Sequence, residues 1–162
     1  MTFAFDAYVT AVHFDRAGRA SFALGDGTVR FEGGEAVEAH DGACLAACLP
    51  AKGMGLLTGG DDGRVVVSTP DGAQEIARVA GRWVDCVAAS AESGLIAFGA
   101  GRELHVRDAA DPAFTRVFAH ERSVADVAFD PKGRRLAVAT YGGVWFWYAR
   151  IADQKPTVFK WA

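Results

Sequence analysis

The sequence predicts an all-β protein built from four similar units, and three observations lead to this fold class. A phrase of about seven residues recurs four times, and its starts lie 35, 40 and 40 residues apart. The runs that follow it alternate apolar and polar side chains, as pleated strands do. No long stretch has the period of an amphipathic helix. The four copies of the phrase occupy residues 9–15, 44–50, 84–90 and 124–130.

Each unit continues with the same series of turns and strands. A turn of small residues follows the phrase, and then come a second apolar run and a glycine-containing turn. The glycine-containing turns are predicted at residues 25–27, 61–63, 99–101 and 141–143. Third strands are predicted at 29–31, 65–67, 104–106 and 144–146, and fourth strands at 35–39, 73–79, 113–119 and 156–161.

Units of four strands with a period near 40 residues predict a β-propeller. A four-stranded antiparallel sheet of this size has two apolar faces, and radial stacking lets each face pack against the next sheet. The alternative all-β architecture, a sandwich, gives no reason for four copies of one phrase at near-constant spacing. We therefore predict one domain over residues 1–162, with about four blades that make up half or more of a ring. The blades are expected at approximately 6–39, 40–80, 81–119 and 120–162.

Composition narrows the class of protein. The chain has 162 residues with 51% hydrophobic and 23% charged side chains, which is typical of one globular domain. Its net charge of −3 argues against non-specific binding to nucleic acid or to an anionic membrane. We see no export or membrane-anchoring segment. Three cysteines do not suggest a disulfide framework, so a cytoplasmic location is expected, and the absence of asparagine fits a GC-rich bacterial source.

Cysteine and histidine residues raise the question of a metal or catalytic site. His40, Cys44 and Cys48 are residue types that bind zinc. On a strand, however, Cys44 and Cys48 would be about 13 Å apart, too far for two thiolates on one zinc ion. Cys86 lies in the same repeat phrase, and nothing places a histidine beside it. We predict structural cysteines and no catalytic residue, metal or cofactor.

Two further stretches have both a functional and a structural interpretation. Residues 59–63 resemble a phosphate-binding or calcium loop, but the Gly-Lys-Ser/Thr and spaced acidic residues of such loops are missing. A turn between strands explains them. The aromatic residues at 144–148 resemble a base-stacking platform, but no basic groove accompanies them. Core packing of a third strand, with one ring exposed if the next blade is absent, explains these residues.

Several phrases resemble the WD-repeat β-propeller family over nearly the whole chain. They include His40-Asp-Gly, Ala119-His120 and Gly25-Asp-Gly-Thr-Val-Arg-Phe31, although the signature dipeptide is absent. In that family a His, a Ser or Thr, an Asp and a Trp form a hydrogen-bonded network within a blade. The matching positions here are Asp26, Asp62, Gly101 and Tyr141 for the aspartate, and Glu32, Ser68, Arg107 and Trp147 for the tryptophan. No unit carries the full set, but His40 is expected to bond Asp62.

The resemblance implies a non-enzymatic scaffold that binds a protein or peptide on the loops at one end of the propeller. Recognition residues usually lie on loops of a rigid scaffold, and Tyr, Trp and Arg are the commonest interface hot spots. The alternative is that such residues only cap blade ends. A second hypothesis is a propeller hydrolase or lactonase with a metal site in blades outside this chain. The predicted partner-binding residues are Tyr8, Arg82, Trp83, Arg122 and Tyr141.

The amino-terminal residues 2–5 alternate like an additional fourth strand. In propellers of this kind such a strand commonly completes the last blade and closes the ring. The fourth unit already has its own fourth strand, so residues 2–5 lack a partner within this chain. We therefore expect either a longer propeller of about seven blades, of which this is roughly half, or a homodimer in which two copies complete one ring.

Overall fold

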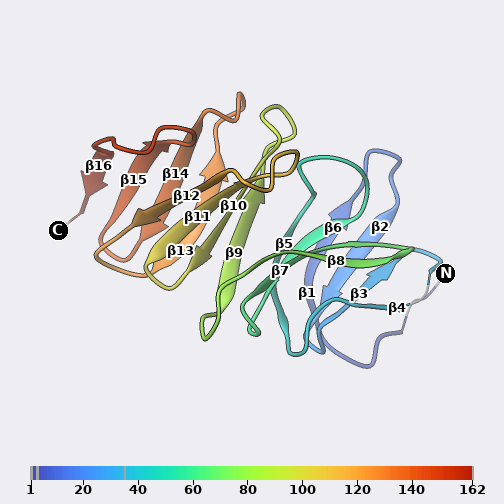
Figure 1. Cartoon of the computed structure of the whole chain (residues 1–162). Coiled ribbons are helices and arrows are strands. Elements are labelled where there is room, and N and C mark those ends of the chain that lie inside the picture. The colour runs from blue at the N-terminus through green and yellow to red at the C-terminus, as the bar shows by residue number, and fades with distance from the viewer. Residues whose placement is uncertain (1, 3, 35, 162) are drawn as a thin grey trace.

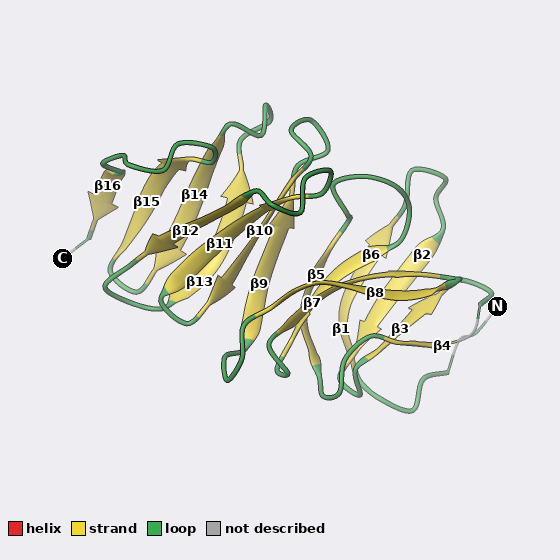
Figure 2. Ribbon diagram, in the orientation of Figure 1, coloured by secondary structure: helices red, strands yellow, loops and turns green. Residues whose placement is uncertain are grey.

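The described residues form strands, turns and loops without any helix. The computed structural model describes residues 2, 4–34 and 36–161, and these contain sixteen β-strands (Figure 1; Figure 2). The strands form four sheets of four antiparallel strands, and in each sheet the strands follow one another in chain order. The described part of the chain has no helix that could span a membrane. These four blades confirm the predicted all-β class and propeller architecture.

The strands of each blade are short and separated by tight turns. The first blade holds β1 (Val9–Phe14), β2 (Ala20–Leu24), β3 (Thr28–Phe31) and β4 (Ala36–Glu38). The second holds β5 (Cys44–Cys48), β6 (Leu56–Gly60), β7 (Arg64–Thr69) and β8 (Gly72–Arg78). The third holds β9 (Val84–Ala89), β10 (Leu95–Ala100), β11 (Glu103–Asp108) and β12 (Thr115–Ala119). The fourth holds β13 (Val124–Phe129), β14 (Arg135–Thr140), β15 (Gly143–Tyr148) and β16 (Thr157–Lys160).

The blades follow one another through space in the order of the chain. Figure 1 shows the first blade at the amino-terminal end and the fourth at the carboxyl-terminal end. The first strands of neighbouring blades contact one another, with β1 against β5 and with β9 against both β5 and β13. The first strands therefore form the inner side of the arrangement, as they do in a propeller.

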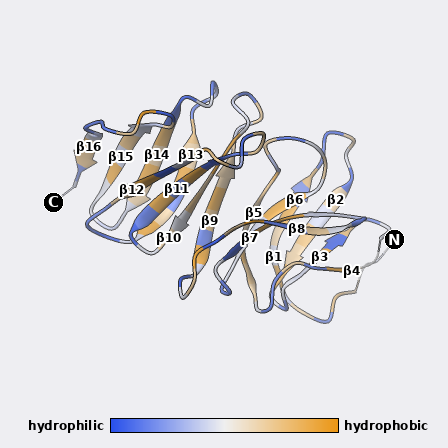
Figure 3. Cartoon of the chain, in the orientation of Figure 1, coloured by the Kyte–Doolittle hydropathy of each residue, from blue (hydrophilic) through white to orange (hydrophobic). Residues whose placement is uncertain are grey.

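Hydrophobic side chains pack between successive blades on both faces of the two middle sheets. Leu56 and Val66 belong to the cluster shared with the first blade, whereas Leu57 and Val65 belong to the cluster shared with the third. All four side chains are fully buried. Adjacent residues of one strand point to opposite faces, so a strand between two blades needs apolar residues on both sides. Hydrophobic colours accordingly concentrate in the strands of Figure 3.

Two strand glycines let neighbouring blades approach closely. Gly59 of β6 and Gly99 of β10 lie against the first strand of the following blade. A Cβ on Gly59 would lie 2.6 Å from the backbone oxygen of Val84. The sequence predicted a turn at residues 59–63. In the structure the turn comprises residues 61–63, because Gly59 and Gly60 are part of β6.

As expected of a strand whose partner lies outside this chain, the described residues among 2–5 pair with no strand here, and their role in closing a ring stays a prediction. Thr2, Ala4 and Phe5 have no strand conformation, and Phe3 lies outside the described residues. The ring of Phe5 instead packs against Phe22 of β2, with centroids 5.1 Å apart.

The close approach at Gly59 predicts a loss of stability in Gly59→Ala. Because the added methyl group would meet backbone atoms of the third blade, the blades must move apart, and we expect a loss of about 1–3 kcal/mol. Chemical denaturation followed by tryptophan fluorescence measures the change. Gly34→Ala is the matched control, because a Cβ there meets only ordinary contacts. Equal stability of the two variants would contradict the assignment of Gly59 to blade packing.

Candidate functional site on the start face

The loops at one end of the propeller collect the residues predicted to bind a partner. Antiparallel pairing places the start of the first and third strands at the same end as the close of the second and fourth strands. We call this end the start face, and the other end the opposite face. The start face comprises the loops at residues 6–8, 25–27, 39–43, 61–63, 79–83, 101–102, 120–123 and 141–142.

Every first strand has an irregularity where it leaves the start face. The pairing register skips one residue near the beginning of β1, β5, β9 and β13. Such bulges increase the local twist and change the direction of nearby side chains, and they are common beside functional sites. The skipped residues are Thr10, Leu45, Asp85 and Ala125.

The predicted partner-binding residues lie on this face and are accessible to solvent. The relative exposure is 68% for Tyr8, 65% for Trp83 and 86% for Tyr141. Arg82 and Arg122 are exposed as well. Large aromatic side chains with this exposure are available for contact with another molecule.

Two of the five predicted residues line one hollow. Arg122 and Tyr141 share a shallow hollow of about 410 Å³ with Trp145 and Trp161. Glu121, Gly142 and Lys160 complete its lining. The hollow thus combines a guanidinium, an ammonium, the carboxylate of Glu121 and three aromatic side chains, which suits an extended peptide with polar and apolar groups.

The other three predicted residues lie on the loops that precede β1 and β9, and two of them also have structural contacts. The ring of Tyr8 lies over Gly25 in the turn of the first blade. The guanidinium of Arg82 lies against Gly101 in the turn of the third blade. These contacts fit the alternative interpretation as blade caps, but both side chains remain exposed. Trp83 makes no such contact with any of the glycines that the structure describes.

A buried histidine organises the loop between the first and second blades. The Nδ1 atom of His40 lies 3.0 Å from Oδ1 of Asp62, and Nε2 lies 2.9 Å from Oγ1 of Thr58. A carboxylate can only accept, so Nδ1–H donates to Asp62 and Nε2 accepts from the Thr58 hydroxyl. The expected bond between His40 and Asp62 is present. Thr58 was missed, although it is the Thr of the network that the family resemblance describes.

Asp62 also holds the surrounding turn. Its carboxylate accepts the backbone N–H groups of Asp41 and Arg64, each at 3.0 Å. Burial alone would raise the pKa of Asp62, but the hydrogen bonds from Arg64, His40 and Asp41 outweigh it and hold the pKa below its usual 3.8. Asp62 is therefore ionised at neutral pH and fixes the conformation of two loops of the start face.

A second histidine links the third and fourth blades. The indole Nε1–H of Trp147 donates to Nε2 of His120 over 3.1 Å. The two rings meet edge to face, and Trp147 also stacks on Phe118. Trp147 is 8% exposed, as predicted for a core ring, whereas Tyr148 at the end of the same aromatic stretch is 52% exposed. In the sequence, His120 and Trp147 match the histidine and tryptophan of the WD-repeat family, but the bond between them was not predicted.

The cysteines have the properties of core residues. Cys44 and Cys86 are buried and Cys48 is partly buried, and all three are free thiols. Burial raises the pKa of each thiol to about 12, so none is a reactive thiolate at neutral pH. Among the residues that the structure describes, no group of three His, Cys, Asp or Glu side chains could hold a metal ion.

The four stacked blades of four antiparallel strands are those of a β-propeller. Residues 113–147 match the family model described as "WD domain, G-beta repeat". This segment runs from β12 of the third blade to Trp147 of the fourth, and it contains both partners of the His120–Trp147 bond. The chain therefore contains a WD repeat at residues 113–147 and has the fold of WD-repeat β-propellers.

Solved structures share this fold. Sqt1 from Chaetomium thermophilum superposes with a TM-score of 0.73 at 16% identity, over 95% of this chain and 48% of Sqt1. The same protein bound to the N-terminus of the ribosomal protein L10 gives 0.72 at 17% identity, over 92% and 48%. A chain of the mitotic checkpoint complex gives 0.77 at 17% identity, over 99% and 53%. The present chain thus spans about half the length of these chains. A comparison of its sequence with curated proteins found no match.

Removal of the Asp62 charge should destabilise the second blade. Asp62→Asn loses the carboxylate that receives three donors, and we expect a loss of about 1–3 kcal/mol at neutral pH. Because the pKa of Asp62 is lower in the folded chain than in the unfolded chain, the ionised carboxylate stabilises the folded state at pH values above 3.8. This contribution is lost as the pH falls through the pKa that Asp62 has in the folded chain. The variant should lack that acid dependence. Asp41→Asn serves as the control, and an equal loss in both variants would contradict this role of Asp62.

His120 should make stability depend on pH near neutrality. Burial lowers the pKa of His120 below its usual 6.5, more than its backbone hydrogen bonds raise it. The unfolded chain therefore binds more protons, and stability that is complete above pH 6.5 falls as the pH decreases from there. In His120→Gln the decrease in unfolding free energy between about pH 7.5 and about pH 5.5 should be smaller than in the original protein. If the decrease in unfolding free energy is the same in both proteins, it comes from another group, such as His105. Burial lowers the pKa of His105 as well.

Proposed function

We propose that this chain is part of a non-enzymatic β-propeller scaffold that binds a protein or peptide on its start face. The observation that carries the proposal is a hollow on the fourth blade, which contains most of the WD repeat at residues 113–147. The hollow is lined by Arg122, Tyr141, Trp145 and Trp161. The similarity to Sqt1, which has been solved with the N-terminus of the ribosomal protein L10, supports protein binding as the class of function.

The distribution of charge on the start face indicates what kind of segment would fit. Acidic side chains gather on the loops of the first two blades, where Asp6, Asp26 and Asp41 are exposed. Arginines are exposed on the loops of the last two blades. These are Arg82, Arg102 and Arg122. A partner segment with a basic part and an acidic part would be oriented by this asymmetry, because complementary charges set register more than affinity.

Two other expectations stay proposals. We propose a cytoplasmic location, which the three free cysteines support. We also propose that further blades, or a second copy in a homodimer, cover the outer faces of the first and fourth blades. Exposed hydrophobic residues on these sheets support this proposal. They are Val12 and Phe14 on β1, and Phe159 on β16.

Alanine substitutions on the start face should abolish partner binding without unfolding the protein. The double variants Arg82→Ala/Trp83→Ala and Arg122→Ala/Tyr141→Ala each remove an exposed cation and an exposed ring. If these are hot spots, each variant should bind the partner about 30-fold more weakly or worse. The measurement is quantitative affinity purification from source cells, followed by titration of the partner that is recovered.

The control variant Lys132→Ala/Tyr148→Ala removes the same residue types from the opposite face. It should retain binding, and the melting temperature of all variants should stay close to that of the original protein. Unchanged binding by both start-face variants would exclude this surface. Stoichiometric calcium together with esterase or lactonase turnover would favour the hydrolase hypothesis over the scaffold.

A further inference from the structure

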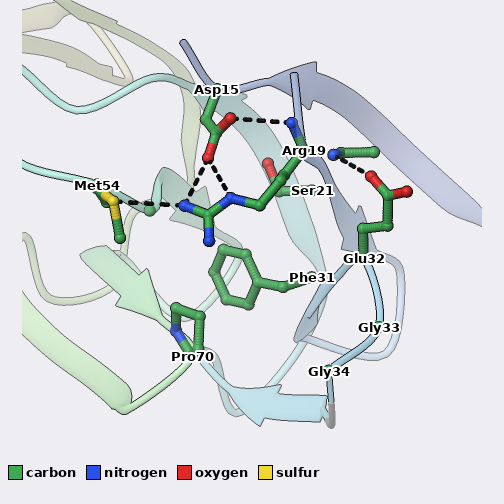
Figure 4. A pocket seen from close by; sticks show the side chains of 11 residues that line it. Asp15, Arg19, Ser21, Phe31, Glu32, Gly33, Gly34, Met54 and Pro70 are labelled. Carbon is green, nitrogen blue, oxygen red and sulfur yellow. Dashed lines mark hydrogen bonds and ion pairs between the residues drawn. The ribbon is translucent and has the colours of Figure 1, made fainter. Parts of the chain in front are cut away.

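A separate hollow lies on the opposite face, at the junction of the first and second blades. It has a volume of about 240 Å³, and the side chains of Phe31, Met54 and Pro70 provide apolar walls (Figure 4). Arg19 and Glu32 stand at its edges. Its residues come from loops that the partner-binding prediction did not include, so it is independent of the start face.

The guanidinium of Arg19 is held in place beside these apolar walls. Its Nε and Nη2 atoms each lie 2.9 Å from Oδ2 of Asp15, and Nη2 lies 3.4 Å from the sulfur of Met54. Among the described residues Nη1 makes no hydrogen bond, and Figure 4 shows it beside the hollow. A guanidinium fixed on one side and free on the other is prepared to bind a carboxylate with little loss of side-chain entropy.

The two carboxylates near Arg19 are already engaged within the protein. Oδ1 of Asp15 accepts the backbone N–H groups of Ala17 and Arg19, while Oδ2 accepts from the guanidinium. These hydrogen bonds, first of all that from the Arg19 backbone, hold the pKa of Asp15 low. Oε2 of Glu32 accepts the backbone N–H of Ala20 at 2.9 Å. Both charges thus serve the local turns.

A second hollow adjoins the first and is basic. It has a volume of about 440 Å³, shares Asp15, Arg19 and Met54 with the first hollow, and adds Arg16 and Lys52. Arg16, Arg19 and Lys52 line this hollow together with one carboxylate, Asp15, which is committed to its own turn, and the Asp108 carboxylate interacts with Lys52 from the neighbouring blade. In a chain with a net charge of −3, this is a local excess of positive charge.

We propose that the two hollows form one docking site for an acidic segment of a partner protein that inserts a single apolar side chain. The first hollow, at about 240 Å³, has room for one anchor side chain, and the basic hollow of about 440 Å³ extends from it along the surface. Phe31, Met54 and Pro70 contact this anchor. Arg16, Arg19 and Lys52 receive acidic residues on one side of it. The site goes beyond the proposed start-face function, and both faces can be occupied at once.

The probe for this site is a fluorescein-labelled heptapeptide with acidic residues on both sides of one central leucine. Comparison peptides carry serine in place of leucine, or lysine in place of the acidic residues. Fluorescence anisotropy with the full chain measures affinity at low and at physiological salt. We expect the leucine peptide to bind about tenfold more tightly than the serine peptide. The lysine peptide should not bind, and salt should weaken binding of the acidic peptides.

Two variants test the two halves of the site. Arg16→Glu/Lys52→Glu should weaken binding of both acidic peptides by about tenfold or more. Met54→Ser should reduce the affinity for the leucine peptide to that for the serine peptide. The matched control is Lys132→Glu/Arg134→Glu, which makes the same change of charge elsewhere on the opposite face and should bind normally. Arg82→Ala/Trp83→Ala should also bind normally, so failure here and failure of the start-face proposal can be told apart.

Three results would overturn the proposal. The first is no saturable binding of the acidic leucine peptide at millimolar concentration. The second is an equal loss in the matched control, which would mean that net charge alone attracts the peptide. The third is unchanged affinity in both Arg16→Glu/Lys52→Glu and Met54→Ser.

Discussion

Burial of both faces of each middle sheet is the constraint on which the structure depends. In β6 the neighbouring residues Leu56 and Leu57 are both fully buried, one against the first blade and the other against the third. A strand of this kind is stable only when a sheet covers it on each side. The hydrophobic effect therefore acts between blades more than within them, and each blade depends on its neighbours for most of its stability.

The other structural features follow from this stacking. Gly59 and Gly99 allow the first strand of the next blade to approach closely. Every first strand also contains a bulge near its start. Buried polar groups must then be paired where the blades meet. His40 is paired through both ring nitrogens, with Asp62 and Thr58, whereas His120 is paired with Trp147 through Nε2 and its buried Nδ1 has no hydrogen-bond partner among the described residues. These pairs hold the loops of the start face in place, and exposed side chains such as Tyr141 project from those loops into solvent.

Much of the fold could be predicted because a strand's side-chain alternation is a local property. The predicted first strands begin at Val9, Cys44, Val84 and Val124, and the observed strands begin at the same residues. The candidate site was only partly accessible to such reasoning. His40 and Asp62 were paired through the family pattern, whereas Thr58 and the His120–Trp147 bond depend on residues 18 and 27 positions apart that meet only across strands. The hollow beside Arg19 was not predicted, since its walls come from four separate loops.

The sequence by itself determined the class of fold, the number of blades in this chain and the end of the blades at which Tyr8, Trp83 and Tyr141 lie. These features follow from period and alternation, which stacking of identical units requires. The tertiary structure decided which side chains share a hollow and which polar groups pair. It also decided that the ring of Phe5 packs against Phe22 of β2. Such outcomes depend on distances between segments remote in the chain, and local sequence carries no direct record of them.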